Sequence, residues 1–387
     1  MLWGIAITMG DVLNKHFQNV LHISKSSSGL VQLSIFGAYA VMGIPAGFYM
    51  RKFGYKSGVL LGLGLYAAGA FLFVPASNQA SFGIFRIALF VLACGLATLE
   101  TVAHPLIAAL GNEKTSDQRM NLAQAFNSLG GIIGPLLGSY FILSNNYNND
   151  LISVKYLYLI IGLVITAIAV LFSFLKIKIH QQNSYSSSDT NHLSPLTDKN
   201  LFKHKHFIFA VVAQFFNVAA QGGTWAYFIN YGHEVMHFSD AISANYFAFS
   251  IFLMMIGRFF GTIIMRFIKP QTLLAFFAIA NIIMCVLVAQ ADGWLSFVAL
   301  LMINFFFSIM FPTIFSLGLK ELGTKAQQGS SYIVMGVVGG AVFPPLMGLI
   351  ANQNVAQAYY LPIICYVVIF TFAISYSAFR TEQKTAV

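Results

Sequence analysis

The sequence predicts an all-α membrane protein in which twelve transmembrane helices form two pseudo-symmetric six-helix bundles. The 387 residues are 58% hydrophobic and only 9% charged, with mean hydropathy +0.74, whereas soluble domains carry about 25% charged residues. Pro and Gly lie within the apolar runs, and the alternating ten-residue segments typical of an outer-membrane barrel are absent, so helices are expected. A repeated order of short motifs indicates the two halves.

The apolar runs give the expected spans, because a transmembrane helix needs about 20 largely apolar residues. Runs of this kind occupy residues 1–21, 29–50, 57–76, 83–111, 119–143, 155–176, 206–231, 241–266, 271–290, 294–319, 328–351 and 358–379. The longest connection, 177–205, is polar and rich in Ser and Asn, which is typical of a flexible linker. We therefore expect an N-terminal bundle over 1–176, a cytoplasmic linker over 177–205 and a C-terminal bundle over 206–387.

The Lys and Arg residues predict the orientation. With both termini in the cytoplasm, most of the basic residues fall on the cytoplasmic side, and Lys15, Lys25, Arg86 and Lys155 fall on the opposite side. This bias also accounts for the net charge of +9, so no nucleic-acid partner is implied. We expect a multi-pass protein of the cell inner (cytoplasmic) membrane that contacts the lipid bilayer and acts as a monomer.

The two halves repeat short motifs in the same order. "HPLIAALG" at 104–111 recurs as "FPTIFSLG" at 311–318, and "GGIIGP" at 130–135 recurs as "GGAVFP" at 339–344. Duplicated six-helix halves joined by a long cytoplasmic loop are the architecture of a secondary transporter, whose substrate site lies near the midplane between the halves.

Two acidic residues, Asp11 and Glu100, lie inside apolar spans. A carboxylate at mid-membrane depth costs a few kcal/mol, and such acids usually mark an ion or substrate pathway. Desolvation favours the neutral form, so each acid is suited to take up and lose a proton. His104, four residues after Glu100, shares its helix face and is a third proton-coupling candidate. The alternative is that these side chains are held by hydrogen bonds for packing alone.

Amides and one indole form a candidate substrate site. They are Gln124 and Asn127 on the fifth span, Gln214, Asn217, Gln221 and Trp225 on the seventh, Asn245 on the eighth and Asn304 on the tenth. Neutral amides match ring hydroxyls and an aromatic face stacks on a pyranose, so a neutral sugar fits better than an organic anion. The alternative for the amides is interhelical hydrogen bonding.

Other chemistries have little support in the sequence. Cys94, Cys285 and Cys365 lie in apolar segments without CxxC or metal-ligand spacing, so they are expected to be buried apolar residues. The sequence lacks a phosphate-cradling GxxxxGK[ST], an HExxH and a serine-nucleophile context. We expect no enzyme activity, no cofactor and no metal.

Eight stretches resemble a known family. They are "LWGIAITMGDVLNKHFQ", "SGLVQLSIFGAYAVMGIPAGFYMRKFGYKSG", "TLETVAHP", "RMNLAQAFNSLG", "AQGGTWAYFINY", "GRFFGT", "FPTIFSLGLKELG" and "GSSYIVMGVVGG". The chain is similar to the major facilitator superfamily and, within it, to the fucose–proton symporter group of sugar permeases. This resemblance implies twelve helices in two bundles, alternating access and proton-coupled sugar uptake.

The resemblance also implies roles for individual residues. Asp11 and Glu100 would be the carboxyls of binding and proton coupling, and Gln124 and Asn127 would line the sugar site. The family usually has Asn where Thr8 and His104 stand, which makes Thr8 a substrate-site candidate and leaves the identity of the sugar open. The family's stretch that matches "LWG" is preceded by a cytoplasmic lead, so further residues are expected upstream of Met1.

These observations favour a carrier that binds a proton and a neutral monosaccharide, L-fucose or a related hexose or pentose, from an outward-facing state. The alternative is a sugar-binding membrane sensor with the same fold that does not translocate. An intramembrane enzyme is disfavoured, because the sequence lacks a nucleophile–base constellation.

Overall fold

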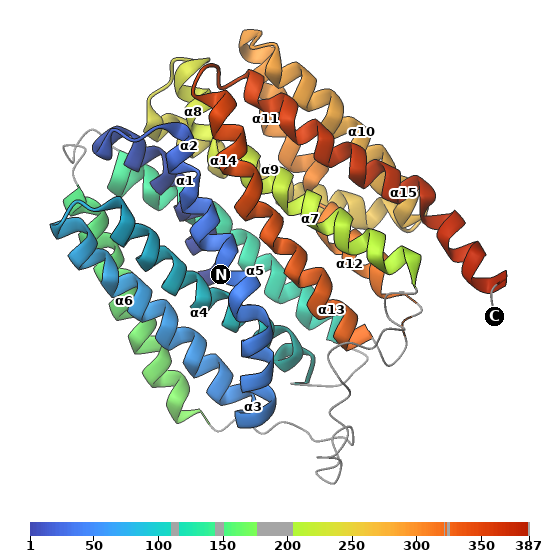
Figure 1. Ribbon diagram of the computed structural model, residues 1–387, viewed down its shortest axis with the longest axis horizontal. Helices are drawn as coiled ribbons and strands as arrows, with labels where there is room; N and C mark the ends of the chain where they lie inside the picture. The colour runs from blue at the N-terminus through green and yellow to red at the C-terminus, as the bar shows by residue number, and fades with distance from the viewer. Residues whose placement is uncertain (110–115, 144–150, 176–203, 321, 323–325, 386–387) are drawn as a thin grey trace.

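The computed structural model describes residues 1–109, 116–143, 151–175, 204–320, 322 and 326–385, and within these ranges some side chains, including those of His104 and Gln124, lie outside the description. The described chain is almost entirely helical, with its N-terminal and C-terminal halves side by side (Figure 1). The expected linker lies outside the described residues apart from its last two positions, so the division into three parts stays a prediction.

The N-terminal half contains α1 (Leu2–Leu21), α2 (Lys25–Ser28), α3 (Leu30–Asn78), α4 (Phe82–Ala109), α5 (Ser116–Gly138), the π-helical turn η2 (Ser139–Leu143) and α6 (Leu151–Phe174). α3 covers two expected spans, which meet at Gly54. The φ of Gly54 is +84°, a left-handed value that glycine adopts at no steric cost, and it allows the chain to change direction without an intervening loop.

The C-terminal half contains α7 (Lys205–Ala226), α8 (Phe228–Glu234), α9 (Asp240–Ile264), α10 (Pro270–Ala289), α11 (Gly293–Phe307), α12 (Met310–Leu319), α13 (Ala326–Met335), η5 (Gly336–Val338), α14 (Gly339–Ala351), η6 (Gln357–Tyr360) and α15 (Leu361–Thr385). Several expected spans are therefore broken helices: α7 with α8, α11 with α12, and α13 with α14.

Eleven of the described segments are long and apolar enough to cross a membrane. The first expected span, α1, is not among them, although it has 20 residues and lies within the bundle. Twenty helical residues extend about 30 Å, the thickness of a bilayer core. Its polar residues lower its hydropathy, and most of α1 between Gly4 and Phe17 is buried by other helices. The twelve-helix membrane fold predicted from the sequence is confirmed.

Glycines explain one of the sequence repeats. A Cβ on Gly130 would lie 2.1 Å from the carbonyl oxygen of Met1, and a Cβ on Gly339 would lie 1.9 Å from the carbonyl oxygen of Phe215. These contacts join α5 to α1 in one half and α14 to α7 in the other. The repeated Gly-Gly motif thus permits the same close helix approach in both halves.

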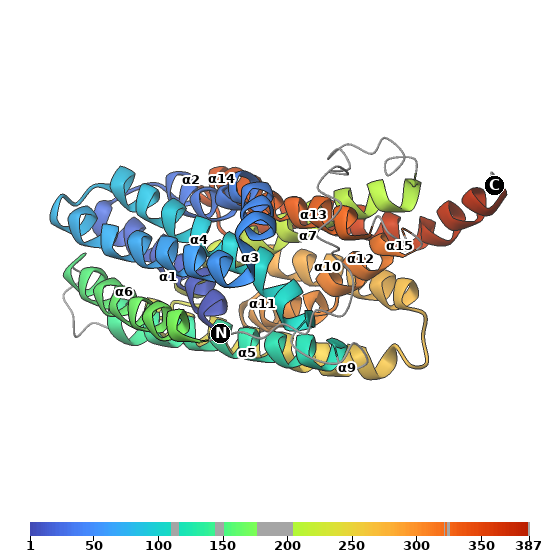
Figure 2. The same cartoon turned by 90° about the horizontal axis from the view of Figure 1, so that it is seen from below.

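The halves meet along two seams. α5 packs against α9, and the α2–α3 segment packs against α14. α5 and α9 lie side by side in Figure 2, and α2 and α14 lie together in both views. α1 also contacts α7 and α8. The first spans of the two halves are therefore central to the interface, where the sequence predicts the substrate site.

Candidate functional site between the two halves

Asp11 lies in the middle of α1 and is buried, 2% exposed. Gln32, near the start of α3 and equally buried, donates a hydrogen bond from Nε2 to Asp11 Oδ1. In the part of the chain that the structure describes, Asp11 Oδ2 and Gln32 Oε1 have no hydrogen-bond partner. Buried polar atoms are nearly always satisfied, so this pair retains capacity for a proton, a water or a ligand hydroxyl.

Glu100 lies on α4 and is half-buried. The hydroxyl group of Tyr39, on α3, hydrogen-bonds with the Glu100 side chain, and the indole N–H of Trp3 on α1 donates to the same hydroxyl. A chain of hydrogen bonds thus links α1, α3 and the carboxyl group on α4. Sequence reasoning found Glu100 because acids are rare in apolar spans. It missed Tyr39 and Gln32, although "VQLSIFGAY" places a Gln and a Tyr seven residues apart in an apolar run.

Two of the three candidate amides on α7 are fully buried. Gln214 and Asn217 have no solvent exposure, and both polar atoms of each side chain lack a hydrogen-bond partner among the described residues. Leaving a buried amide unpaired costs about 1–3 kcal/mol per group. Such atoms are suited to meet ligand hydroxyls. Gln221, one turn further on, is half-buried.

Trp225 and Asn304 make an interhelical network instead. Trp225 Nε1 donates to Asn304 Oδ1 at 2.8 Å, and Asn304 Nδ2 donates to Ser250 Oγ at 2.9 Å. Ser250 in turn donates to the carbonyl oxygen of Leu301 at 2.9 Å. These contacts join α7, α11 and α9, which matches the alternative of helix-to-helix bonding that the sequence left open.

The other candidates occupy different environments. The Thr8 hydroxyl donates to the Gly4 carbonyl oxygen at 2.9 Å and faces Gly134 of α5. Asn127 is half-buried beside Gly4, and its Oδ1 has no described hydrogen-bond partner. Asn245 is exposed. The side chains of His104 and Gln124 lie outside the description, so their roles, like those of all the proposed site residues, stay predictions.

One end of the interface is closed by polar contacts between the halves; we call it the sealed end. It is formed by the last turns of α1, by α2, by α8 and the start of α9, and by the end of α14. Asn14 Nδ2 donates to the carbonyl oxygen of Ala226 at 2.9 Å, and Asn230 Nδ2 donates to Gln18 Oε1 at 2.6 Å. These bonds join α1 to α7 and α8.

Asp240 is the centre of one ionic contact at the sealed end. It begins α9, after Ser239, whose side chain caps the helix, and a carboxylate is favoured near a helix N-terminus. Asn19 Nδ2 lies 2.6 Å from Asp240 Oδ2, while His233 Nδ1 and Lys15 Nζ lie 2.9 and 3.7 Å from Oδ1. The Lys15 side chain is 7% exposed and that of Asp240 is 12% exposed.

Lys25 forms a second contact there. Its Nζ lies 2.7 Å from Glu234 Oε2 and 2.6 Å from the carbonyl oxygen of Ala351, and its backbone N–H donates to Asn352 Oδ1 at 2.8 Å. At a different place, on the α5–α9 seam, Arg258 donates to Ser128 Oγ at 2.8 Å.

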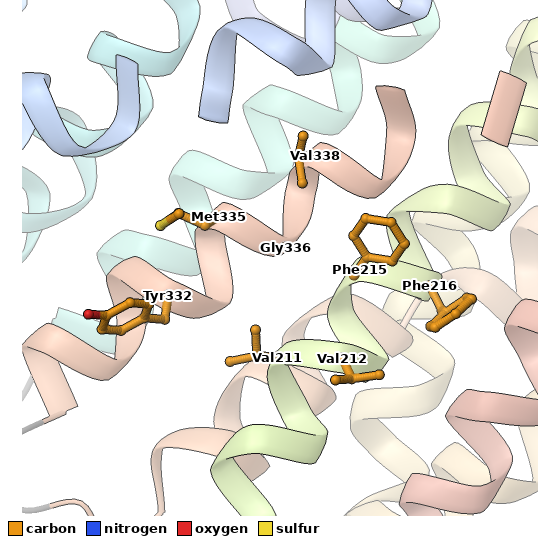
Figure 3. A pocket seen from close by; sticks show the side chains of 8 residues that line it. All are labelled: Val211, Val212, Phe215, Phe216, Tyr332, Met335, Gly336 and Val338. Carbon is orange, nitrogen blue, oxygen red and sulfur yellow. The ribbon is translucent and has the colours of Figure 1, made fainter. Parts of the chain in front are cut away.

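A groove of about 430 Å³ lies elsewhere, between α7 and the α13–η5 segment (Figure 3). Its walls include Val211, Phe215, Tyr332 and Met335. This lining offers few hydrogen-bonding groups, so it does not resemble a site for a polyhydroxylated ligand. The three cysteines are buried and free, as expected. In the described residues, no group of three or more His, Cys, Asp or Glu side chains is arranged to hold a metal ion.

Two helical halves, a buried carboxyl group on α1 at their interface, a half-buried one on the neighbouring α4 and a closed end define a multi-pass membrane transporter. The chain belongs to the major facilitator superfamily, because the sequence profile described as Major Facilitator Superfamily matches residues 1–344.

Individual relatives are similar over nearly the whole chain. The L-fucose-proton symporter of Escherichia coli is 36% identical, over 99% of this chain and 92% of that protein. The glucose/galactose transporter of Brucella abortus biovar 1 is 34% identical, over 94% of this chain and 89% of that protein. A crystal structure of the E. coli fucose:proton symporter matches with a TM-score of 0.72 over 97% of this chain and 96% of that chain. A D-xylose-proton symporter, 13% identical, shares the fold with a TM-score of 0.75 over 97% of this chain and 94% of that chain.

Proposed function

We propose that this protein is a proton-coupled symporter of a neutral monosaccharide that works by alternating access. Relatives named as L-fucose-proton symporters and glucose/galactose transporters match nearly the full chain, which supports a hexose such as L-fucose, or a related pentose, as the substrate. The observation that carries the proposal is the pair of acids inside the helical bundle: Asp11 on α1, which contacts the C-terminal half, and Glu100 on α4, which packs against α1 and α3.

The acids account for the coupling. When Asp11 and Glu100 are protonated, their neutral forms lower the cost of enclosing the site in an apolar bundle. The amides Gln214 and Asn217, unpaired among the described residues, supply donors and acceptors for the sugar hydroxyls. Loss of the proton on the far side restores the charge. Because only the N-terminal half carries acids in its spans, we propose that this half handles protons while both halves hold the sugar.

The orientation assigns a side to the sealed end. If both termini lie in the cytoplasm, as the Lys and Arg distribution predicts, the turn after α1 lies on the outer side of the membrane. The contacts of Lys15 and Lys25 then form the outer gate. This conformation then precedes or follows release of the cargo to the cytoplasm. The sequence predicts that the sugar and the proton bind in an outward-facing state. In alternating access, that state alternates with the conformation described here, in which the outer gate is closed. We propose that the carrier acts as a monomer and catalyses no chemical reaction.

Uptake in proteoliposomes tests the proposal. Radiolabelled fucose, galactose, glucose and arabinose are offered under an inward proton gradient, with and without an uncoupler. We expect accumulation of at least one sugar that the uncoupler abolishes. Glu100→Gln should lose proton-driven accumulation and retain sugar counterflow. Asp292→Asn, which neutralises an exposed acid between α10 and α11, serves as the matched control and should behave as the wild type.

The sensor alternative predicts a different outcome. A sensor of the same fold binds sugar without moving it, so sugar addition would not alkalinise the medium of a cell suspension. No observation on the described residues favours it. Sugar binding with no accumulation and no alkalinisation for any sugar in the panel would contradict the symport proposal.

A further inference from the structure

One face of α3 contacts both acids. Gln32 and Tyr39 are seven residues apart, two helical turns, so they lie on the same face of the helix. Gln32 bonds to Asp11 of α1, and Tyr39 bonds to Glu100 of α4. Both α3 side chains are buried, with 1% and 2% exposure. Neither residue was among the candidates from the sequence.

The direction of each hydrogen bond follows from donor chemistry. The indole of Trp3 has an N–H and no acceptor, so Tyr39 Oη must accept the bond from Trp3. The one hydrogen of the Tyr39 hydroxyl is then available to Glu100. Gln32 likewise donates from its amide nitrogen to Asp11. Both acids therefore receive hydrogens, and a hydrogen bond donated to a carboxyl group favours its charged form over its neutral form.

The same face of α3 also contacts the other half. Phe36 lies four residues after Gln32 and three before Tyr39, so all three share one face of α3. A Cβ built on Gly340 of α14 would lie 2.7 Å from the Phe36 ring, so α14 packs directly on this ring in the sealed conformation. When the halves rock apart at the sealed end, this contact must change, and the α3 face that positions the acids is part of the moving seam.

Other ionisable groups lie on the helices that carry the two acids and on the helices packed against these. Those on the helices packed against them include Tyr66 on α3, Lys15 and His16 on α1, Lys25 on α2, and His233 and Glu234 on α8. Lys15 and Lys25 are engaged with Asp240 and Glu234 at the sealed end. The side chains of His104 on α4 and of Asp117 and Arg119 on α5 lie outside the described residues.

We propose that Tyr39 and Gln32 are positioning residues for proton release: in the conformation closed at the sealed end, they stabilise the deprotonated carboxylates of Glu100 and Asp11. The carboxyl O–H bond breaks, the proton passes to water, and the carboxylate left behind is held by the hydrogen that α3 donates. The inference rests on the proposed symport and adds the groups that make proton loss favourable on the cytoplasmic side.

Tyr39→Phe is the main test, since it removes the hydroxyl and keeps the ring. Right-side-out proteoliposomes are prepared at a series of lumenal pH values, and both proton-driven uptake and sugar counterflow are measured. A hydrogen bond to a charged group contributes about 1.5–3 kcal/mol, equivalent to roughly 10- to 100-fold in proton release and one to two pH units. We expect uptake at neutral lumenal pH to fall by about tenfold or more, while counterflow, which needs no proton loss, stays within about twofold.

Raising the lumenal pH should restore uptake by the Tyr39→Phe variant. The lower proton concentration in the lumen makes release of the proton from the acids easier. Gln32→Leu should change the profile in the same direction. Tyr66→Phe is the matched control: Tyr66 is a buried tyrosine of α3 whose hydroxyl donates its hydrogen bond to the Leu2 carbonyl oxygen at 3.5 Å, away from both acids, and its pH profile should match the wild type.

An unchanged lumenal pH profile in Tyr39→Phe overturns the inference. So does a loss of counterflow together with uptake that no lumenal pH restores in a variant whose thermal unfolding matches the wild type. A wild-type protein without proton-dependent sugar uptake would instead contradict the proposed symport, so the two failures are distinguishable.

Discussion

Gln18 on α1 and Asn230 on α8 exchange hydrogen bonds across the bundle interface. Asn230 Nδ2 lies 2.6 Å from Gln18 Oε1, and Gln18 Nε2 lies 3.4 Å from Asn230 Oδ1. The two residues are 212 positions apart, as are Asn14 and Ala226. This separation is close to the offset between the sequence repeats, so these bonds join neighbouring, though not equivalent, positions of the two halves.

Asp240→Asn should open the sealed end more than Glu234→Gln does. The carboxylate of Asp240 contacts the side chains of Asn19, His233 and Lys15, and the Asp240 side chain is 12% exposed. In the second pair, the side chain of Lys25 is 17% exposed and that of Glu234 is 33% exposed. An exposed ion pair contributes about 0–1 kcal/mol. A Ser26→Cys reporter at the α2–α14 seam, labelled with an impermeant maleimide, should react faster in Asp240→Asn. Equal rates in the two variants would contradict this ranking.

Asn217→Leu should weaken sugar binding without destabilising the fold. The amide of Asn217 is buried and unpaired among the described residues, so an apolar replacement of similar size removes a desolvation cost of about 1–3 kcal/mol. We expect a melting temperature equal to or above that of the wild type, and sugar affinity lower by about tenfold or more. Thermal unfolding and equilibrium binding on the same preparation provide the check. Unchanged affinity would assign Asn217 to packing.

Ser250→Ala should show the opposite pattern. Ser250 links Asn304 on α11 to the Leu301 carbonyl oxygen, so its loss leaves buried groups of a helix–helix network unpaired. We expect a destabilisation of about 1–2 kcal/mol and sugar affinity within about twofold of the wild type. A large loss of affinity at unchanged stability would instead place the Trp225–Asn304 network at the sugar.

Gly130→Ala should impair folding, because a methyl group there would overlap the Met1 carbonyl oxygen at the α1–α5 crossing. Gly37→Ala on α3 is the control, since a Cβ at that position meets no atom within 4 Å. A helical Gly-to-Ala change at an open position stabilises by about 0.4–1 kcal/mol. We therefore expect a large drop in the yield of monodisperse Gly130→Ala protein, with Gly37→Ala at or above the wild-type yield.

Much of the fold was predictable, because span length and apolar composition reflect the bilayer itself. The twelve runs all correspond to helices in the structure. The breaks within spans were not predicted: Tyr227 and Gly336 interrupt helices within apolar runs, where hydropathy gives no signal. The orientation and the linker stay predictions.

The site was predictable only where a residue is unusual for its surroundings. Asp11 and Glu100 stand out because charge is costly in lipid. Gln32 and Tyr39 do not, since isolated Gln and Tyr residues are common in such spans, and their importance comes from which acid they face. The sealed end depends on contacts between residues more than 200 positions apart, such as Lys25 with Glu234, which no local pattern encodes.

The polarity of α1 has a consequence for biogenesis. Asp11, Asn14, Lys15 and His16 make it, among the spans the structure describes, the one that lacks the composition of a membrane helix, yet it precedes the other expected spans along the chain. The helices that bury it include α5 and α7, and α7 is synthesised about 200 residues later. Its stable insertion must therefore await chain still to be made. The span that carries Asp11, a proposed proton-coupling residue, is therefore one whose own composition does not favour entry into the bilayer.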